Sequence, residues 1–154
     1  MKHRLLILAT ALLLAFTRAL GHGGVELGPN GGRILEFSKD ETLHGEVLLK
    51  DGQFTVTLLD KDLKPVELKD QSLAVMGGSR SNPEKPAVTK ANGRFAFPAL
   101  KGDEYELVLR FKESPDAKAI TARFTYDAAI CSDCKNPEWL CKCPSEKQSS
   151  PARK

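Results

Sequence analysis

The chain has 154 residues, of which 41% are hydrophobic, enough for one globular domain with a single core. Its formal net charge of +3 comes from 23 Lys and Arg against 20 Asp and Glu. Three of the cations, Lys2, Arg4 and Arg18, lie near the N-terminus, and without them the two signs balance. The rest of the chain therefore lacks the clustered cationic surplus typical of nucleic-acid binding, and no nucleic-acid partner is expected.

Residues 1–21 are typical of a secretory signal peptide. A basic start precedes an apolar run over residues 5–16, which falls short of the roughly 20 residues that a membrane-spanning helix needs. Small residues at Ala19 and Gly21 place the predicted cleavage before His22, with a cut after Ala19 as the alternative. We therefore expect an exported protein, periplasmic or secreted, with no transmembrane helix in its mature chain.

The first predicted strands form a hairpin. Segments 33–37 and 43–49 are expected to pair antiparallel over a short connection, with Glu36 opposite His44. The glycine-rich turn 28–32 would fold the N-terminal arm back along the first strand. In this register one face carries the apolar side chains expected in the core: Val25, Leu27, Leu35, Phe37, Leu43, Val47 and Leu49.

The opposite face of this unit is expected to point outward and to carry His22, Glu26, Glu36, His44 and Glu46. A His at a free N-terminus offers its amine and its ring Nδ1 to one ion, and such nitrogen ligands suit Cu(II). Neighbouring strands lie about 4.8 Å apart, so two imidazoles leaning across the middle strand can reach a shared metal. His22 and His44 are therefore candidate ligands, with Glu36 or Glu46 as a weaker ligand or as a hydrogen-bond acceptor. The alternative is an ordinary polar sheet face.

Alternating apolar and polar residues predict four further strands, over 53–58, 95–97, 105–111 and 120–126. Proline-containing pairs mark loops or strand breaks between strands: Lys64-Pro65, Asn82-Pro83 and Ser114-Pro115.

Two dipeptides, Asp51-Gly52 and Asn92-Gly93, suit tight hairpin turns because both of their residues tolerate positive φ. No stretch after the signal peptide has a helical period. We predict seven to nine strands and an all-β domain over 22–126, a single β-sandwich of immunoglobulin-like or transthyretin-like build.

Two stretches, HGGVELGPNGGRILEF at 22–37 and LHGEVLLKDGQFTVTLLDKDLKPVEL at 43–68, resemble the N-terminal GPNGG-type segments of bacterial heavy-metal efflux adaptor proteins. The resemblance implies periplasmic metal handling, a cation-efflux complex as a partner, and His22 and His44 as ligands. The long helical hairpin of a full adaptor is not expected here. A looser resemblance, resting on the His-Gly start and a sandwich, is to copper carriers and polysaccharide monooxygenases. A short chain with one tryptophan argues against the latter.

The C-terminal region, 127–144, holds every cysteine of the chain in the spacing C-x2-C-x6-C-x-C: Cys131, Cys134, Cys141 and Cys143. Four sulfurs so spaced can form two disulfides or one tetrahedral Zn(II) or Cu(I) site. An oxidising compartment favours the disulfides, while the CxxC and CxC pairs are good ligand spacing. Trp139 is expected to pack this region against the sandwich. The polar tail 145–154 is expected to be disordered.

Motifs of common enzyme classes are not found in the sequence, including a serine nucleophile elbow, a phosphate-binding glycine loop and a paired-His metalloprotease motif. The sequence therefore predicts a non-enzymatic, exported protein that binds Cu or Zn and acts in heavy-metal efflux or homeostasis. The alternative is a structural or interaction module of the cell envelope, with a disulfide-stapled tail and no metal function.

Overall fold

A computed structural model describes residues 25–79 and 81–143. The predicted signal peptide (1–21), the candidate ligand His22 and the polar tail (145–154) lie outside the described residues. Within the described ranges, no helix is long and apolar enough to cross a membrane.

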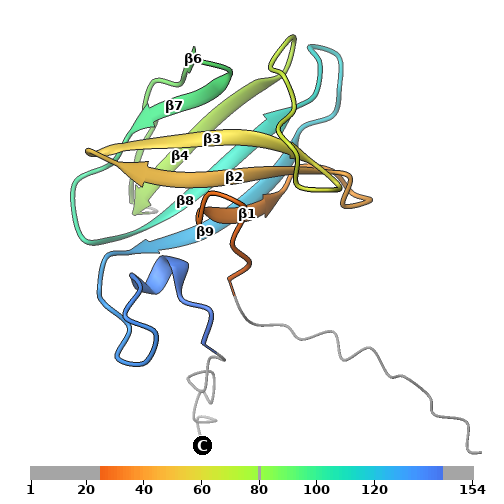
Figure 1. Cartoon of the computed structure of the whole chain (residues 1–154). Helices are drawn as coiled ribbons and strands as arrows, with labels where there is room; N and C mark the ends of the chain where they lie inside the picture. Colours follow the sequence, from red (N-terminus) through yellow and green to blue (C-terminus); the bar gives the residue numbers. More distant parts are fainter. Residues whose placement is uncertain (1–24, 80, 144–154) are drawn as a thin grey trace, which may run out of the picture.

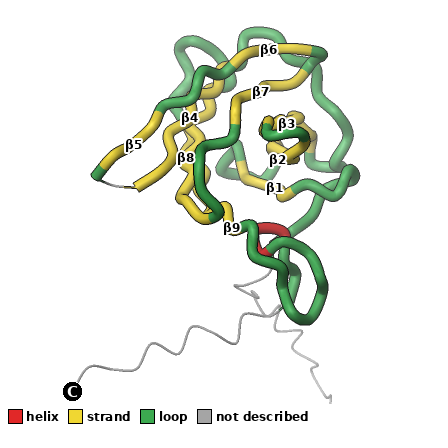
Figure 2. The backbone as a smooth tube through the Cα atoms, turned by 90° about the vertical axis from the view of Figure 1, so that its left-hand side faces the viewer, coloured by secondary structure: helices red, strands yellow, loops and turns green. Residues whose placement is uncertain are grey.

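The described chain folds into two antiparallel sheets that pack face to face, so the predicted β-sandwich is confirmed (Figure 1). Five strands form one sheet in the order β1-β2-β3-β7-β6, and four form the other in the order β5-β4-β8-β9. The two layers are seen edge-on in Figure 2. In chain order the strands are β1 (Arg33–Glu36), β2 (Leu43–Lys50), β3 (Gln53–Asp60), β4 (Ser72–Ser79), β5 (Asn82–Glu84), β6 (Thr89–Ala91), β7 (Arg94–Pro98), β8 (Glu104–Lys112) and β9 (Ile120–Asp127).

Both predicted hairpin turns are confirmed. Asp51 and Gly52 join β2 to β3 with φ values of 51° and 73°. Asn92 and Gly93 join β6 to β7 with φ values of 52° and 71°. Two successive positive φ angles match the twist of the flanking strands, and Asp, Asn and Gly adopt them at low cost.

The core lies between the sheets and is built from the apolar half of each alternating strand. In β8 the side chains of Tyr105, Leu107, Leu109 and Phe111 are buried, whereas Glu106 between them is exposed. The two sheets also interlock through aromatic rings: Phe37, directly after β1, stacks on Phe111 of β8 with ring centroids 4.6 Å apart. Burial of this kind contributes roughly 1.5–3 kcal/mol per large apolar side chain.

The predicted register of the N-terminal hairpin is also confirmed. Glu36 pairs with His44, and the N–H of Phe37 donates to the carbonyl of Leu43 at 2.9 Å. The N-terminal arm folds back as expected, because Leu27 lies opposite Arg33 in an antiparallel bridge.

One expectation about this hairpin is wrong. The face that carries His44 and Glu46 was expected to point into solvent, but His44 is 8% exposed and Glu46 0%. On the adjoining face of β3, Thr57 is 6% and Leu59 0% exposed. This part of the sheet is therefore buried on both sides. Alternation read from the sequence locates the strand but does not reveal a second cover. His44 and Glu46 are buried with hydrogen-bond partners, whereas the hydroxyl of Thr57 is buried without a partner among the described residues.

A second correction concerns Asn82-Pro83, which was expected to break a strand and instead lies within β5. Pro83 has no N–H to donate. It is tolerated because β5 is the outermost strand of its sheet, where one backbone edge needs no partner.

Candidate metal centre

The C-terminal segment, residues 128–143, leaves β9 and folds into a small loop of its own. The N–H of Ala128 donates to the carbonyl of Asp103, which ties the start of the segment to the sandwich. Ile130 then pairs with Pro137 in an isolated bridge, so the residues between them form a closed loop. That loop carries the first two cysteines.

The turn between Cys131 and Cys134 is closed by backbone hydrogen bonds. The N–H of Lys135 donates to the carbonyl of Cys131 at 3.1 Å, and the N–H of Cys131 donates to the carbonyl of Asn136 at 2.9 Å. Lys135 adopts a φ of 61°, in the left-handed region. This reversal directly after the CxxC pair turns both sulfurs toward one side of the loop.

The second cysteine pair is delivered by a single 3₁₀ turn, η1 (Glu138–Leu140). Its last hydrogen bond runs from the N–H of Cys141 to the carbonyl of Glu138. Cys141 then returns to extended backbone, which carries Cys143 back over the first pair.

The four sulfurs meet at one point. The Sγ of Cys141 lies 3.3 Å from that of Cys131 and 3.6 Å from that of Cys134, and the Sγ of Cys143 lies 4.0 Å from that of Cys131. All four lie within 4.8 Å of one another. In a tetrahedral site with zinc–sulfur bonds of 2.3 Å, the sulfurs stand about 3.8 Å apart. The spacing therefore fits a shared metal ion.

Disulfides are not formed by these four cysteines, which are all free thiols. A disulfide would hold a pair of sulfurs about 2.05 Å apart, well below the shortest separation in the cluster. Of the two possibilities that the spacing left open, the structure supports a site capable of metal binding and gives no support to two bridges.

Backbone N–H groups point at the sulfurs and modify their acidity. The N–H of Asn136 donates to the thiol of Cys134 and lowers its pKa to about 7. The N–H of Cys143 acts on Cys141 in the same direction, at 3.4 Å from the sulfur. The Cys131 thiol, desolvation and the thiols of Cys134 and Cys143 together outweigh it, and the pKa of Cys141 is raised to about 12. The Cys134 thiolate forms readily, whereas raised pKa values make Cys141 and Cys143 resist ionisation, and a bound cation would supply positive charge that favours their thiolates.

Trp139 anchors this cluster to the sandwich, as the sequence predicted. Its ring is 4% exposed and stacks on Phe124 at 5.9 Å, with its edge to Phe54 at 5.8 Å and Tyr126 beside it. Arg33 adds a second contact, since its Nη1 donates to the carbonyl of Trp139 at 2.9 Å. In Figures 1 and 2 the segment lies at the side of the sandwich where β1 and β9 approach each other.

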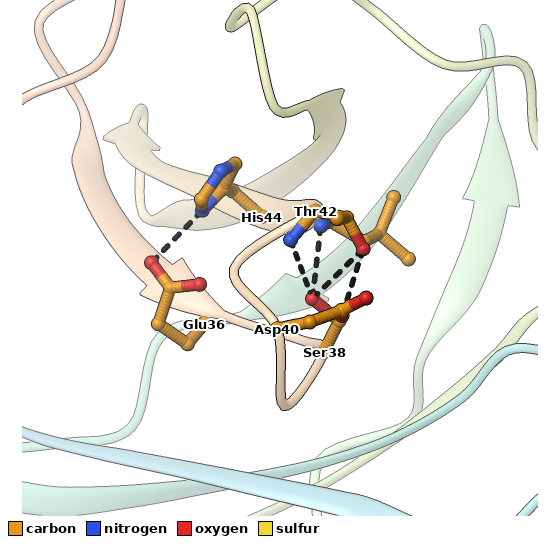
Figure 3. A network of polar contacts seen from close by, with 6 residues as sticks. Glu36, Ser38, Asp40, Thr42 and His44 are labelled. Carbon is orange, nitrogen blue, oxygen red and sulfur yellow. Dashed lines mark hydrogen bonds and ion pairs between the residues drawn. The ribbon is translucent and has the colours of Figure 1, made fainter.

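Of the predicted histidine site, the structure brings His44 and Glu36 into contact. The Nδ1 of His44 lies 2.8 Å from Oε1 of Glu36 (Figure 3). A carboxylate oxygen only accepts, so Nδ1 carries the proton and Nε2 is the nitrogen available to a metal. Carboxylates commonly hold metal-binding histidines in this way. Glu36 is therefore placed as the acceptor that orients His44.

The carboxylate of Glu46 is occupied by hydrogen bonds to the glycine-rich turn. Its Oε1 accepts from the N–H of Asn30 at 2.7 Å and of Gly32 at 3.1 Å, and its Oε2 accepts from Nδ2 of Asn30 at 2.7 Å. A metal at Glu46 would have to displace these contacts. A Cβ at Gly28 would lie 2.7 Å from its carboxyl carbon, which explains why a glycine is needed there.

Sequence reasoning missed this buried carboxylate. The available signal was the glycine-rich turn itself, because closely packed backbone N–H groups form a natural cradle for an anion.

The remaining polar contacts near His44 are local to the β1–β2 connection (Figure 3). Ser38 Oγ accepts from the N–H groups of Thr42 and Leu43 at 2.8 and 3.0 Å. Thr42 Oγ1 donates to Asp40 at 2.9 Å and lowers the pKa of that carboxyl group. These bonds shape the turn and hold Phe37 and Leu43 in register.

Comparison of this chain with protein-family models, with curated proteins and with solved structures found no match.

Proposed function

We propose that this protein is an exported metal-binding protein that holds one Zn(II) or Cu(I) ion on Cys131, Cys134, Cys141 and Cys143. The observation that carries the proposal is the convergence of four free thiols within 4.8 Å of one another. Zinc accepts four thiolates in a tetrahedron, and Cu(I) is a soft ion that prefers sulfur ligands.

Three features support metal binding by these four thiols. The cluster is built from two short turns that are each closed by backbone hydrogen bonds. Two backbone N–H groups are aimed at sulfur, and such bonds stabilise a thiolate. The three cysteines other than Cys131 are only half-buried, so an ion has a path to the site.

Export and a role in heavy-metal homeostasis are part of the proposal. They rest on the signal-peptide pattern of residues 1–21 and on the resemblance of residues 22–68 to segments of efflux adaptors. The chain would then act as a small metal carrier or sensor beside a cation-efflux complex. The competing function is a structural module of the envelope whose four cysteines only staple the C-terminal segment.

A second metal site is favoured by one observation. The orientation of His44 by Glu36 leaves Nε2 as the available nitrogen. The bridge between Leu27 and Arg33 starts the N-terminal arm along β1, and the arm would approach this pair if the residues before Val25 continued in the same register. We propose that His22, with its free amine, joins His44 on one Cu(II) ion.

The thiolate proposal is tested on protein purified from the exported fraction. Metal analysis is expected to find one zinc or copper per chain. Co(II) added to metal-free protein is expected to give the strong sulfur-to-metal charge-transfer and ligand-field bands of a tetrahedral thiolate. Cys134→Ser is expected to abolish or shift these bands, whereas Ser132→Ala, in the same turn, is expected to leave them unchanged.

Thiol counting on denatured, metal-free, unreduced protein separates the two proposed functions. Four free thiols support the metal site. Zero free thiols, together with no bound metal, would establish the stapled structural module instead.

A further inference from the structure

The C-terminal segment lacks a core of its own. Among residues 128–143 only Cys131 and Trp139 are buried, and Ile130 is 62% exposed. After the hydrogen bond from Ala128 to Asp103 at its start, the segment is held at two further places, the sulfur cluster and the site where Trp139 packs on the sandwich. Ordering a stretch of this length is entropically unfavourable, so these two places must together compensate for it.

The site where Trp139 packs, called its seat below, is formed by side chains of the sandwich. Phe54, Phe124 and Tyr126 surround the indole ring, and Arg33 holds the backbone carbonyl of Trp139. The guanidinium of Arg33 also lies 5.3 Å from the ring centroid of Phe124. Residues from β1 and β9 thus contact the same residue, Trp139, which lies at the side of the sandwich between these two strands.

The seat and the sulfur cluster share one turn of chain. Trp139 is the middle residue of η1, and Cys141 follows that turn directly. The N–H of Cys141 donates to Glu138, and the N–H of Glu138 donates to Ala129, at the base of the CxxC loop. Withdrawing Trp139 from its seat would therefore displace Cys141, and displacing Cys141 would open the cluster.

We infer that the thiolate site is a metal-operated latch: an ion on the four sulfurs fixes the segment with Trp139 seated between β1 and β9, and loss of the ion releases it. This inference rests on the proposed metal function. The physical basis is linkage, since an ion that binds only the closed arrangement stabilises that arrangement. By the same linkage, a substitution that weakens the seat lowers the apparent metal affinity, by at most the factor by which it shifts the metal-free chain toward the released arrangement. Release would uncover the flank of β9, an edge strand of its sheet.

The test uses the full mature chain, reduced and metal-free, with Zn(II) as the probe. Zinc binding is measured by competition with a chromophoric chelator. Seating is measured separately by the emission of Trp139, the only tryptophan in the chain, and by amide exchange over residues 128–143. We expect a blue shift in emission and slower exchange that both saturate at one equivalent of zinc.

The two measurements distinguish failure of the latch from failure of the site. Zinc that binds at one equivalent without changing emission or exchange would overturn the latch and leave the metal site standing. No binding of zinc, and none of Cu(I) in the same competition assay, would overturn the proposed function and the latch with it.

Arg33→Met sharpens the test because it keeps an apolar stem but removes the donor to Trp139. We expect its zinc affinity to fall by up to about tenfold. When zinc is below one equivalent, a smaller fraction of chains should show the blue-shifted emission and slow exchange of seated Trp139. Lys142→Met, an exposed change between the two cysteines of the CxC pair, is the control and should change neither. Circular dichroism establishes that both variants fold. Wild-type zinc affinity in an Arg33 variant whose Trp139 is released would refute the coupling.

Discussion

The sandwich and the C-terminal segment are stabilised by different forces. In the sandwich, fully buried side chains such as Phe54, Leu107 and Phe111 come from both sheets and form one continuous core. The C-terminal segment buries one indole and one thiol, and its fold depends on sulfurs that lie 3.3–4.0 Å apart.

The difference shows where the environment can act on this protein. Apolar burial in the sandwich is insensitive to metal, thiol reagents and moderate changes of pH. A thiolate cluster responds to all three, because its ligands must be deprotonated to bind an ion. The sandwich is the invariant scaffold, and the segment is the part where a bound ion would act.

The largest effect on folding is expected in the sandwich core. Leu107→Ala removes a fully buried side chain from the middle of β8 and should lower the free energy of unfolding by about 2–5 kcal/mol. Urea unfolding measures this loss. Glu106→Ala, on the exposed face of the same strand, should change stability by less than about 0.5 kcal/mol. Equal losses in the two variants would contradict the assigned faces of β8.

A smaller effect is expected where the glycine-rich turn meets β2. Glu46→Ala leaves the N–H groups of Asn30 and Gly32 without their acceptor and should cost about 1–3 kcal/mol. Thermal unfolding checks this, with Glu26→Ala as an exposed control from the same arm. A wild-type melting temperature for Glu46→Ala would mean that the turn does not depend on the carboxylate.

The sequence was sufficient to predict most of the sandwich because its signals are local. Alternation located β3, β7, β8 and β9, and positive-φ dipeptides located two turns. The hairpin register followed from matching apolar faces, and Glu36 lies opposite His44 as expected. A strand such as β4 is harder to recognise, because Gly77 and Gly78 end its apolar pattern.

The sites were less predictable because they depend on contacts between distant parts of the chain. The burial of Glu46 results from the turn that folds over it, which the pattern of a single strand does not encode. The choice between disulfides and free thiols depends on sulfur separations that the spacing C-x2-C-x6-C-x-C leaves open. The spacing predicted only that the four sulfurs can meet.

Within the C-terminal segment, the cysteines should differ in reactivity when no metal is bound. The pKa of Cys134 is lowered to about 7 and that of Cys141 is raised to about 12. Iodoacetamide attacks the thiolate, so near pH 8 Cys134 should be modified first and Cys141 last. The rate at Cys134 should fall as the pH drops below about 7, because its thiolate is then protonated. Peptide mapping by mass spectrometry follows each site.

Bound zinc should protect Cys134 from this reaction, because a coordinated sulfur is no longer a free nucleophile. Equal rates at Cys134 and Cys141 in the metal-free protein would show that the Asn136 N–H does not favour the Cys134 thiolate. Protection that requires less than one equivalent of zinc would argue for a shared ion between chains.

The smallest effect on folding is expected at Glu36, the half-exposed member of the proposed histidine site. The Glu36 side chain is 45% exposed, so Glu36→Gln should change stability by less than about 0.5 kcal/mol. Its effect on Cu(II) binding should be larger, since losing the carboxylate that orients a ligating histidine typically weakens metal affinity by about 10–100-fold. His44→Ala should remove the ligand and weaken binding further.

Calorimetric titration of chains beginning at His22 tests both variants, with Glu106→Gln as a control on the other sheet. An added residue before His22 should reproduce the His44→Ala defect, because it moves the amine away from the ring nitrogen. If all four proteins bind Cu(II) with wild-type affinity, His22 and His44 do not form a copper site, and the four cysteines are the remaining candidate for metal binding.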